Sequence, residues 1–78
     1  MIDDIISVKM SDSELKQLGQ RIRETRNKRG LTQFEAAEKA DTSANYFAQI
    51  ERGEVNPSYS MLKAIARALK VKLNDLIP

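Results

Sequence analysis

Hydrogen-bonding side chains gather on one side of a short helical pattern in residues 43–53. When this segment is wound as a helix, Asn45, Gln49 and Arg52 point away from the apolar side chain of Phe47. Two amides and a guanidinium in that arrangement bind other polar groups by hydrogen bonds. A polar helical face of this kind is what the major groove of DNA requires of the element that enters it.

The residue types that most enzymes of this size depend on are missing. The chain has 78 residues, no cysteine and no histidine. This composition excludes disulfides, Cys/His zinc sites, thiol nucleophiles and histidine-based triads. We therefore predict a binding protein and not an enzyme, with no catalytic residue, no metal ion, no cofactor and no small-molecule ligand.

The composition favours a single small helical domain. The hydrophobic fraction of 41% is ordinary for a folded chain, and the aromatic fraction of only 5% leaves Leu, Ile and Ala to fill the core. No apolar run approaches the ~18 residues of a membrane span, and no export signal is recognisable. A cytoplasmic protein is expected, associated with the nucleoid when it is bound to DNA.

The overall net charge of +2 hides an uneven distribution. Residues 1–14 hold four acidic residues and one lysine, so the rest of the chain is more basic than the total indicates. A basic body fits a polyanionic partner, although a solvated surface of ordinary sign is the simpler explanation of the charge alone.

Two short helices joined by a tight turn are predicted between about residues 32 and 53. Thr32 and Glu35 match a capping box at the start of the first helix. The break at Asp41 is too short for an antiparallel hairpin, so the helices must cross steeply, as in a helix-turn-helix. A serine caps the second helix, and Gly53 ends it.

A longer helix is predicted before this motif. It begins at the Ser11–Glu14 capping box and stops at Gly30. Its buried stripe includes Leu18 and Ile22. Gly19 lies beside that stripe, and because glycine is costly inside a helix, we expect a second helix to approach closely there.

Two further helices are predicted after the motif. Ser58 caps the first, whose apolar residues recur at spacings of three and four up to Leu69. Residues 73–77 suggest a last single-turn helix. The expected architecture is all-α, a bundle of five helices spanning residues 11–78, with residues 1–10 as an N-terminal leader.

Arg26 and Glu51 are both expected on or beside buried stripes, where an unpaired charge is costly. We predict that they pair in a partly buried ion pair; two independent surface pairs are the alternative. Other basic residues crowd the outer face and end of the first helix: Arg21, Arg23, Lys28 and Arg29. They complement the negative end of the helix dipole, contact phosphate, or do both.

The leader carries isoleucines at positions 2, 5 and 6. It is a partly ordered extension that packs on its own domain, an arm that packs on a second subunit, or a disordered segment. The sequence leaves these three alternatives open.

Taken together, a set of motifs in register resembles the phage-repressor/Cro-like family of helix-turn-helix regulators, also called the xenobiotic-response-element (XRE) family. The matching residues are Thr32–Gln33, Ala37, Ser43, Ile50–Gly53, Asn56–Ser58, Ile65–Ala66, Leu69, Val71, Leu73 and Leu76. The resemblance covers residues from about Leu18 to Ile77. It implies a five-helix bundle of the lambda-repressor-like type that binds operator DNA as a two-fold dimer.

The resemblance also implies a role for individual residues. Base edges would be read by Ala44, Asn45 and Gln49, and the sugar-phosphate backbone would be contacted by Gln33, Ser43, Tyr46 and Arg52. An asparagine or glutamine amide that bonds adenine bidentately contributes ~1–3 kcal/mol of discrimination, whereas an alanine only contacts a thymine methyl. The arginine–glutamate bridge frequent in the family falls on Arg26 and Glu51.

The sequence departs from the family pattern at several structural positions. Asp41 and Lys70 stand where glycine is customary, and Lys72 replaces a capping serine or aspartate. Ala36 stands where leucine is common and Phe47 where a smaller residue is usual, an exchange that would conserve core volume.

These observations predict a sequence-specific regulator of transcription that binds double-stranded operator DNA, and we expect it to bind as a dimer. The dimer contact is expected to involve Val71, Leu73, Leu76 and Ile77, together with the leader isoleucines. The alternative is a protein-interaction or antitoxin-type module built on the same bundle. Such a module would be expected to show an apolar patch in place of the polar face.

Overall fold

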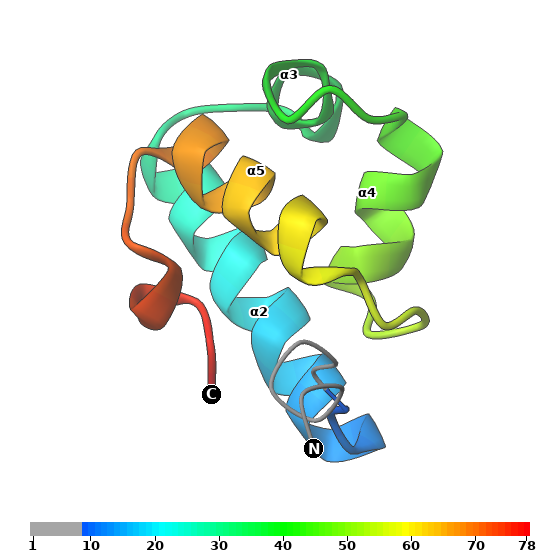
Figure 1. Ribbon diagram of the computed structural model, residues 1–78. Helices are drawn as coiled ribbons and strands as arrows, with labels where there is room; N and C mark the ends of the chain where they lie inside the picture. Colours follow the sequence, from blue (N-terminus) through cyan, green and yellow to red (C-terminus); the bar gives the residue numbers. More distant parts are fainter. Residues whose placement is uncertain (1–8) are drawn as a thin grey trace.

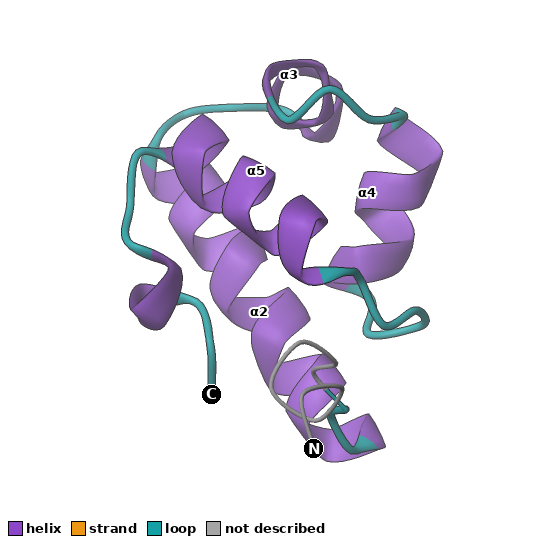
Figure 2. Ribbon diagram, in the orientation of Figure 1, coloured by secondary structure: helices purple, strands orange, loops and turns teal. Residues whose placement is uncertain are grey.

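Four α-helices and one turn of 3-10 helix make up the part of the chain that the computed structural model describes, residues 9–78 (Figures 1 and 2). They are α2 (Asp12–Lys28), α3 (Gln33–Lys39), α4 (Ala44–Glu51), α5 (Tyr59–Leu69) and η1 (Leu73–Asp75). The all-α prediction is confirmed. The count of five helices is not confirmed, because the element expected at residues 73–77 is a single 3-10 turn. Residues 1–8 of the predicted leader, which include its isoleucines, lie outside the described residues.

Each α-helix starts at a hydroxyl side chain that accepts a hydrogen bond from the backbone of its own first turn. The four caps are Ser11, Thr32, Ser43 and Ser58. The predicted capping boxes of α2 and α3 are present. Gly30 follows α2 with φ +71° and Gly53 follows α4 with φ +74°, a conformation that glycine adopts without strain. Local sequence therefore sets where the helices begin and end.

Packing of α4 against both α2 and α3 builds the helix-turn-helix into the bundle, and α5 packs against α3. In Figure 1, α4 lies at the edge of the molecule, with one side toward the bundle and the other outward. Phe47 fills the centre of the core, where it is completely buried with Leu18, Ile22, Leu62 and other apolar side chains. Within residues 9–78, no helix is both long and apolar enough to cross a membrane.

Gly19 marks the closest approach of α2 to α4. A β-carbon added at this position would lie 2.3 Å from the backbone oxygen of Glu51 and 2.6 Å from that of Ile50. Both atoms belong to the backbone, so a side-chain rotation cannot make room. The close contact expected from the cost of glycine within a helix is therefore present.

Two residues with side chains adopt the left-handed conformation usually left to glycine. Asp41 has φ +60° in the turn between α3 and α4, and Lys70 has φ +59° after α5. Aspartate tolerates this conformation better than lysine does, because its short polar side chain can bond to the nearby backbone. Both turns thus use the left-handed conformation with residues that are less suited to it than glycine.

We expect Gly19→Ala to lower the free energy of unfolding by about 2 kcal/mol, because overpacking outweighs the better helix propensity of alanine. Chemical denaturation of this variant and of Gln20→Ala, an exposed neighbour in the same helix, measures the effect. Equal stability of the two variants would show that α2 and α4 are not in close contact at this point.

Lys70→Gly is expected to stabilise the domain by about 0.5–1 kcal/mol, since relief of left-handed strain exceeds the entropy that glycine adds to the unfolded chain. Lys72→Gly makes the same charge change where φ is −79°, and it should give no gain. Thermal melting of both variants compares them directly. A higher melting temperature for the Lys72 variant would contradict the strain argument.

Candidate nucleic-acid interface

The outward side of α4 carries the hydrogen-bonding side chains that the sequence analysis assigned to it. Asn45 is exposed, whereas Gln49, Ala44 and Tyr46 are half-buried. Neither the Asn45 nor the Gln49 amide makes a hydrogen bond to any other part of residues 9–78. Phe47 and its apolar neighbours on the opposite side of α4 are buried in the core. Both amides are thus available to an external partner.

Ser43 combines a structural role with a free donor. Its hydroxyl oxygen accepts a hydrogen bond from the backbone N–H of Tyr46 at 3.0 Å, which caps α4. The residue is exposed, and the hydroxyl hydrogen is not used by the cap. A phosphate oxygen placed at the start of α4 would therefore find a donor there.

The buried carboxylate of Glu51, the last residue of α4, fixes the C-terminal end of that helix. Its side chain is 0% exposed, and it accepts two hydrogen bonds from Arg26, Nε to Oε2 at 2.5 Å and Nη2 to Oε1 at 3.1 Å. Arg23 adds a second basic group, with its Nε 3.6 Å from Oε1. Arg26 also donates from Nη1 to the backbone oxygen of Leu31 at 2.9 Å. The structure thus brings together the pair that the sequence analysis expected, as a two-point bridge between α2 and α4.

Gln33 at the start of α3 belongs to this same network. Its Nε2 donates to Oε1 of Glu51 at 2.9 Å, and the residue is half-buried. The sequence analysis missed this bond, because nothing in the spacing of two residues 18 positions apart indicates it. One of the two amide hydrogens remains for the phosphate contact that the resemblance implies. The bond to Glu51 holds the side chain in a fixed orientation for that contact.

Arg52, another expected phosphate contact, is paired within its own loop. Its Nε donates to Oε2 of Glu54 at 2.8 Å and its Nη2 to Oε1 at 3.0 Å. Hydrogen bonding to Arg52 lowers the pKa of the Glu54 carboxyl below its ordinary value, and the same bond raises the pKa of the guanidinium. Because a lowered acid pKa keeps Glu54 ionised at neutral pH, the pair is fully charged there and is lost only as the pH falls through that lowered value.

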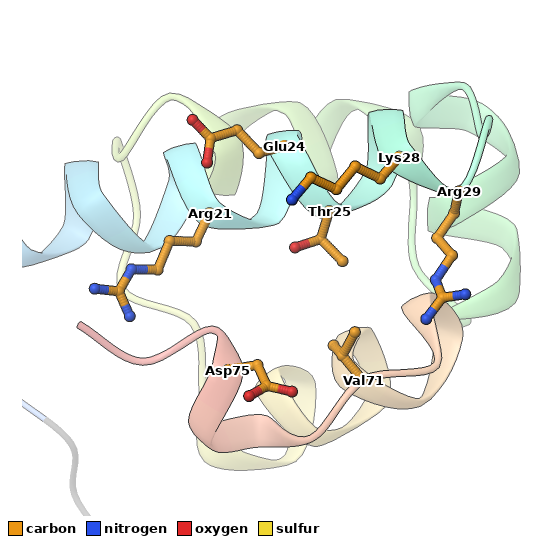
Figure 3. Close-up of a pocket in the computed structure, with 7 residues that line it drawn as sticks. All are labelled: Arg21, Glu24, Thr25, Lys28, Arg29, Val71 and Asp75. Atoms are coloured by element: carbon orange, nitrogen blue, oxygen red, sulfur yellow. The ribbon is translucent and has the colours of Figure 1, made fainter.

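Two of the arginines on the outer side and end of α2 bind the C-terminal segment of the chain. Arg21 donates to the backbone oxygen of Ile77 at 2.7 Å. Arg29 donates to the backbone oxygens of Leu69 at 2.9 Å and Lys70 at 3.1 Å. Figure 3 shows both side chains reaching from the first helix toward the segment that carries Val71 and Asp75. These arginines fasten the end of the chain, a role that the two alternatives of the sequence analysis did not include.

The residues expected at a dimer contact differ in exposure. Leu76 is completely buried in the core of its own chain, so it offers no surface to a second subunit. Val71, Leu73 and Ile77 are half-buried and pack against the edge of the core. The expected contact is therefore reduced to these three residues among those that the structure describes.

Comparison with known proteins agrees with this geometry. A family profile described as a helix-turn-helix domain matches residues 17–76. The chain belongs to the phage-repressor/Cro-like helix-turn-helix family. It is 47% identical over 60 residues to the immunity repressor protein of Bacillus phage phi105, a match that covers 77% of this chain and 42% of the repressor.

Solved structures of the family superpose closely on this helix-turn-helix chain. The restriction-modification controller protein C.AhdI from Aeromonas hydrophila has a TM-score of 0.82 and 32% identity, covering 83% of this chain and 98% of the controller. The DNA-binding domain of BldD has a TM-score of 0.79 and 30% identity, covering 88% and 100%. The chain spans between 42% and 55% of the length of the first curated relatives, which include the transcriptional regulator SinR of Bacillus subtilis.

Removal of the Glu51 carboxylate is expected to destabilise the domain strongly. Glu51→Ala leaves the Arg26 guanidinium, whose side chain is 12% exposed, without its partner, a change that typically costs about 3–5 kcal/mol. Glu38→Ala removes an exposed carboxylate from α3 and should change stability by less than about 0.5 kcal/mol. Urea denaturation measures both variants. A loss below about 1 kcal/mol for Glu51→Ala would show that the buried bridge contributes little.

Proposed function

We propose that this chain is a sequence-specific regulator of transcription that binds double-stranded operator DNA through the outward face of α4. The observation that supports the proposal is that this face holds free hydrogen-bonding groups. Asn45 and Gln49 hold unengaged amides on a helix whose other side is locked into the core. A rigid helix with free hydrogen-bonding groups suits direct readout of base edges in the major groove.

Base contacts and backbone contacts are assigned to different residues in this proposal. Asn45 and Gln49 bond base edges, and Ala44 contacts the methyl group of a thymine. The sugar-phosphate backbone is contacted by Gln33, Ser43, Tyr46 and Arg52. Backbone contacts fix orientation and supply affinity, whereas the amides supply the choice of sequence.

A two-fold dimer follows from the geometry of duplex DNA. One domain presents one recognition helix, and two such helices must stand ~34 Å apart to enter successive turns of the major groove. The half-buried apolar residues Val71, Leu73 and Ile77 occur near the C-terminal end, where each packs against the core, and they provide the contact between subunits. A protein acting in this way binds chromosomal DNA in the cytoplasm.

The alternative of a protein-interaction or antitoxin-type module finds no support on α4. The large hydrophobic side chains exposed within residues 9–78 are Phe34 at 65% and Tyr59 at 49%, on α3 and α5. An interaction surface that replaced DNA binding would be expected to place such side chains on the recognition helix itself.

Selection from random duplex DNA with the purified protein tests the proposal and should yield a two-fold symmetric motif. On the selected duplex, Asn45→Ala or Gln49→Ala should relax preference at particular base pairs, each by about 1–3 kcal/mol. Arg52→Ala should weaken binding to every sequence by a similar factor.

Fluorescence anisotropy with the selected duplex and with single-base variants of it distinguishes these effects. If the Asn45 and Gln49 variants lost affinity equally for all duplexes, the assignment of base reading to α4 would be wrong.

A further inference from the structure

Arg52 and Glu54 form a closed ion pair beside the recognition helix. The two residues flank Gly53, whose left-handed conformation turns the chain so that both side chains meet. Two parallel hydrogen bonds of 2.8 and 3.0 Å join the guanidinium to the two carboxylate oxygens. Both side chains are about half exposed, at 48% and 50%. The pair therefore lies on the surface, within reach of any ligand that approaches the end of α4.

The partner that Arg52 holds resembles the ligand that it is expected to bind. Carboxylate and phosphate both offer paired anionic oxygens that match the planar fork of a guanidinium. In the free protein, the two nitrogens that face Glu54 are occupied by its oxygens. A DNA phosphate that takes the same bidentate position must displace Glu54 first.

We propose that Glu54 is a built-in competitor of DNA phosphate for Arg52 and that it lowers the affinity of the protein for duplex DNA of any sequence. This inference rests on the proposed function. Exposed ion pairs contribute little to stability, so the pair restrains binding without closing the site. By weakening this phosphate contact, Glu54 raises the share of the binding free energy that must come from base contacts.

Surrounding groups provide a place for Glu54 once it has been displaced. Lys16 of α2 lies against Gly53, with its Cγ 2.9 Å from the position that a β-carbon would occupy there. Lys16 and Arg23 line one groove together with Arg52 and Glu54. A displaced carboxylate can therefore pair with a cation of α2, so that it exchanges one cationic partner for another at the surface.

Competition by Glu54 changes how much DNA is bound, and it does not change which base pairs are preferred. A phosphate contact carries no sequence information, so the competition lowers specific and non-specific binding by a similar factor. At a given protein concentration, DNA of random sequence is then left unoccupied, and only sites that satisfy Asn45 and Gln49 are bound. The ratio of specific to non-specific affinity is expected to stay unchanged when Glu54 is removed.

The test is Glu54→Gln, which keeps the size of the side chain and removes its charge. Affinity for both the selected duplex and a mixed-sequence duplex should rise about three- to tenfold, since Arg52 no longer exchanges one anion for another. The plot of log affinity against log salt should steepen by up to about one unit. Glu38→Gln on α3 makes the same change of net charge away from Arg52, and it should raise affinity less than about twofold.

A double-mutant cycle with Arg52→Ala separates competition from simple repulsion of DNA. If Glu54 acts through Arg52, the gain from Glu54→Gln should largely disappear in the Arg52→Ala background. A gain that persists there, or one that is no larger than that of Glu38→Gln, would overturn the proposal. Circular dichroism of each variant checks that the fold is kept. Absence of binding to any duplex at low salt by every variant would overturn the proposed function itself, and this inference with it.

Discussion

A single buried charge, the carboxylate of Glu51, is the constraint on which the arrangement of three helices depends. A carboxylate without exposure to water must be neutralised and hydrogen-bonded. Here Arg26 of α2 supplies the opposite charge together with two hydrogen bonds, and Gln33 of α3 supplies a further hydrogen bond. These contacts are directional, so they define where α4 ends relative to both neighbours. Gly19 acts in the same place, because its missing side chain lets α2 reach the backbone of Glu51. The bonds of Glu51 and the close helix contact at Gly19 together fix the C-terminal end of α4.

This inner network bears directly on the surface that is proposed to bind DNA. Gln33 is the first residue of α3, and its amide is oriented by the same Glu51 oxygen that Arg26 binds. Side chains that are held by packing and hydrogen bonds lose less entropy when a ligand arrives. The buried network therefore fixes both Gln33, a group proposed to contact the DNA backbone, and the helix that carries the amides. By contrast, the pair of Arg52 and Glu54, which directly follows Glu51 at the C-terminal end of α4, lies on the surface and is held by its own two bonds.

Features that depend on neighbouring residues could be predicted from the sequence. The four hydroxyl caps and the stops at Gly30 and Gly53 follow from rules that act within a single turn. Contacts between distant residues were harder to foresee. Pairing of Arg26 with Glu51 could be inferred because both charges fall on buried stripes. Arg21 and Arg29 donate to backbone oxygens 56 and 40 residues away, and a backbone oxygen leaves no mark in the sequence.

Some contacts that were not predicted could have been inferred from the sequence. Arg52 and Glu54 stand on either side of a glycine that was expected to be left-handed, and such a turn brings the two flanking side chains together. Leu76 had no comparable signal, because a single turn of helix is too short for its apolar spacing to show which side faces the core. The all-α class and the helix-turn-helix were therefore accessible from sequence, whereas the division of the basic residues between interior and surface roles was not.

Because several basic residues bind acceptors within the chain, the net charge overstates how many cations are free to attract DNA. Arg21, Arg26 and Arg29 bind acceptors within the chain, so each serves the fold whether or not DNA is present. The attraction for a duplex must then come from fewer cations than the composition suggests, and one of these, Arg52, is itself paired. With electrostatic attraction reduced in this way, the two free amides of α4 decide a larger share of the binding. A small basic domain whose charges are largely paired within the fold is expected to bind DNA of any sequence less tightly, so its exposed amides account for more of the affinity that remains.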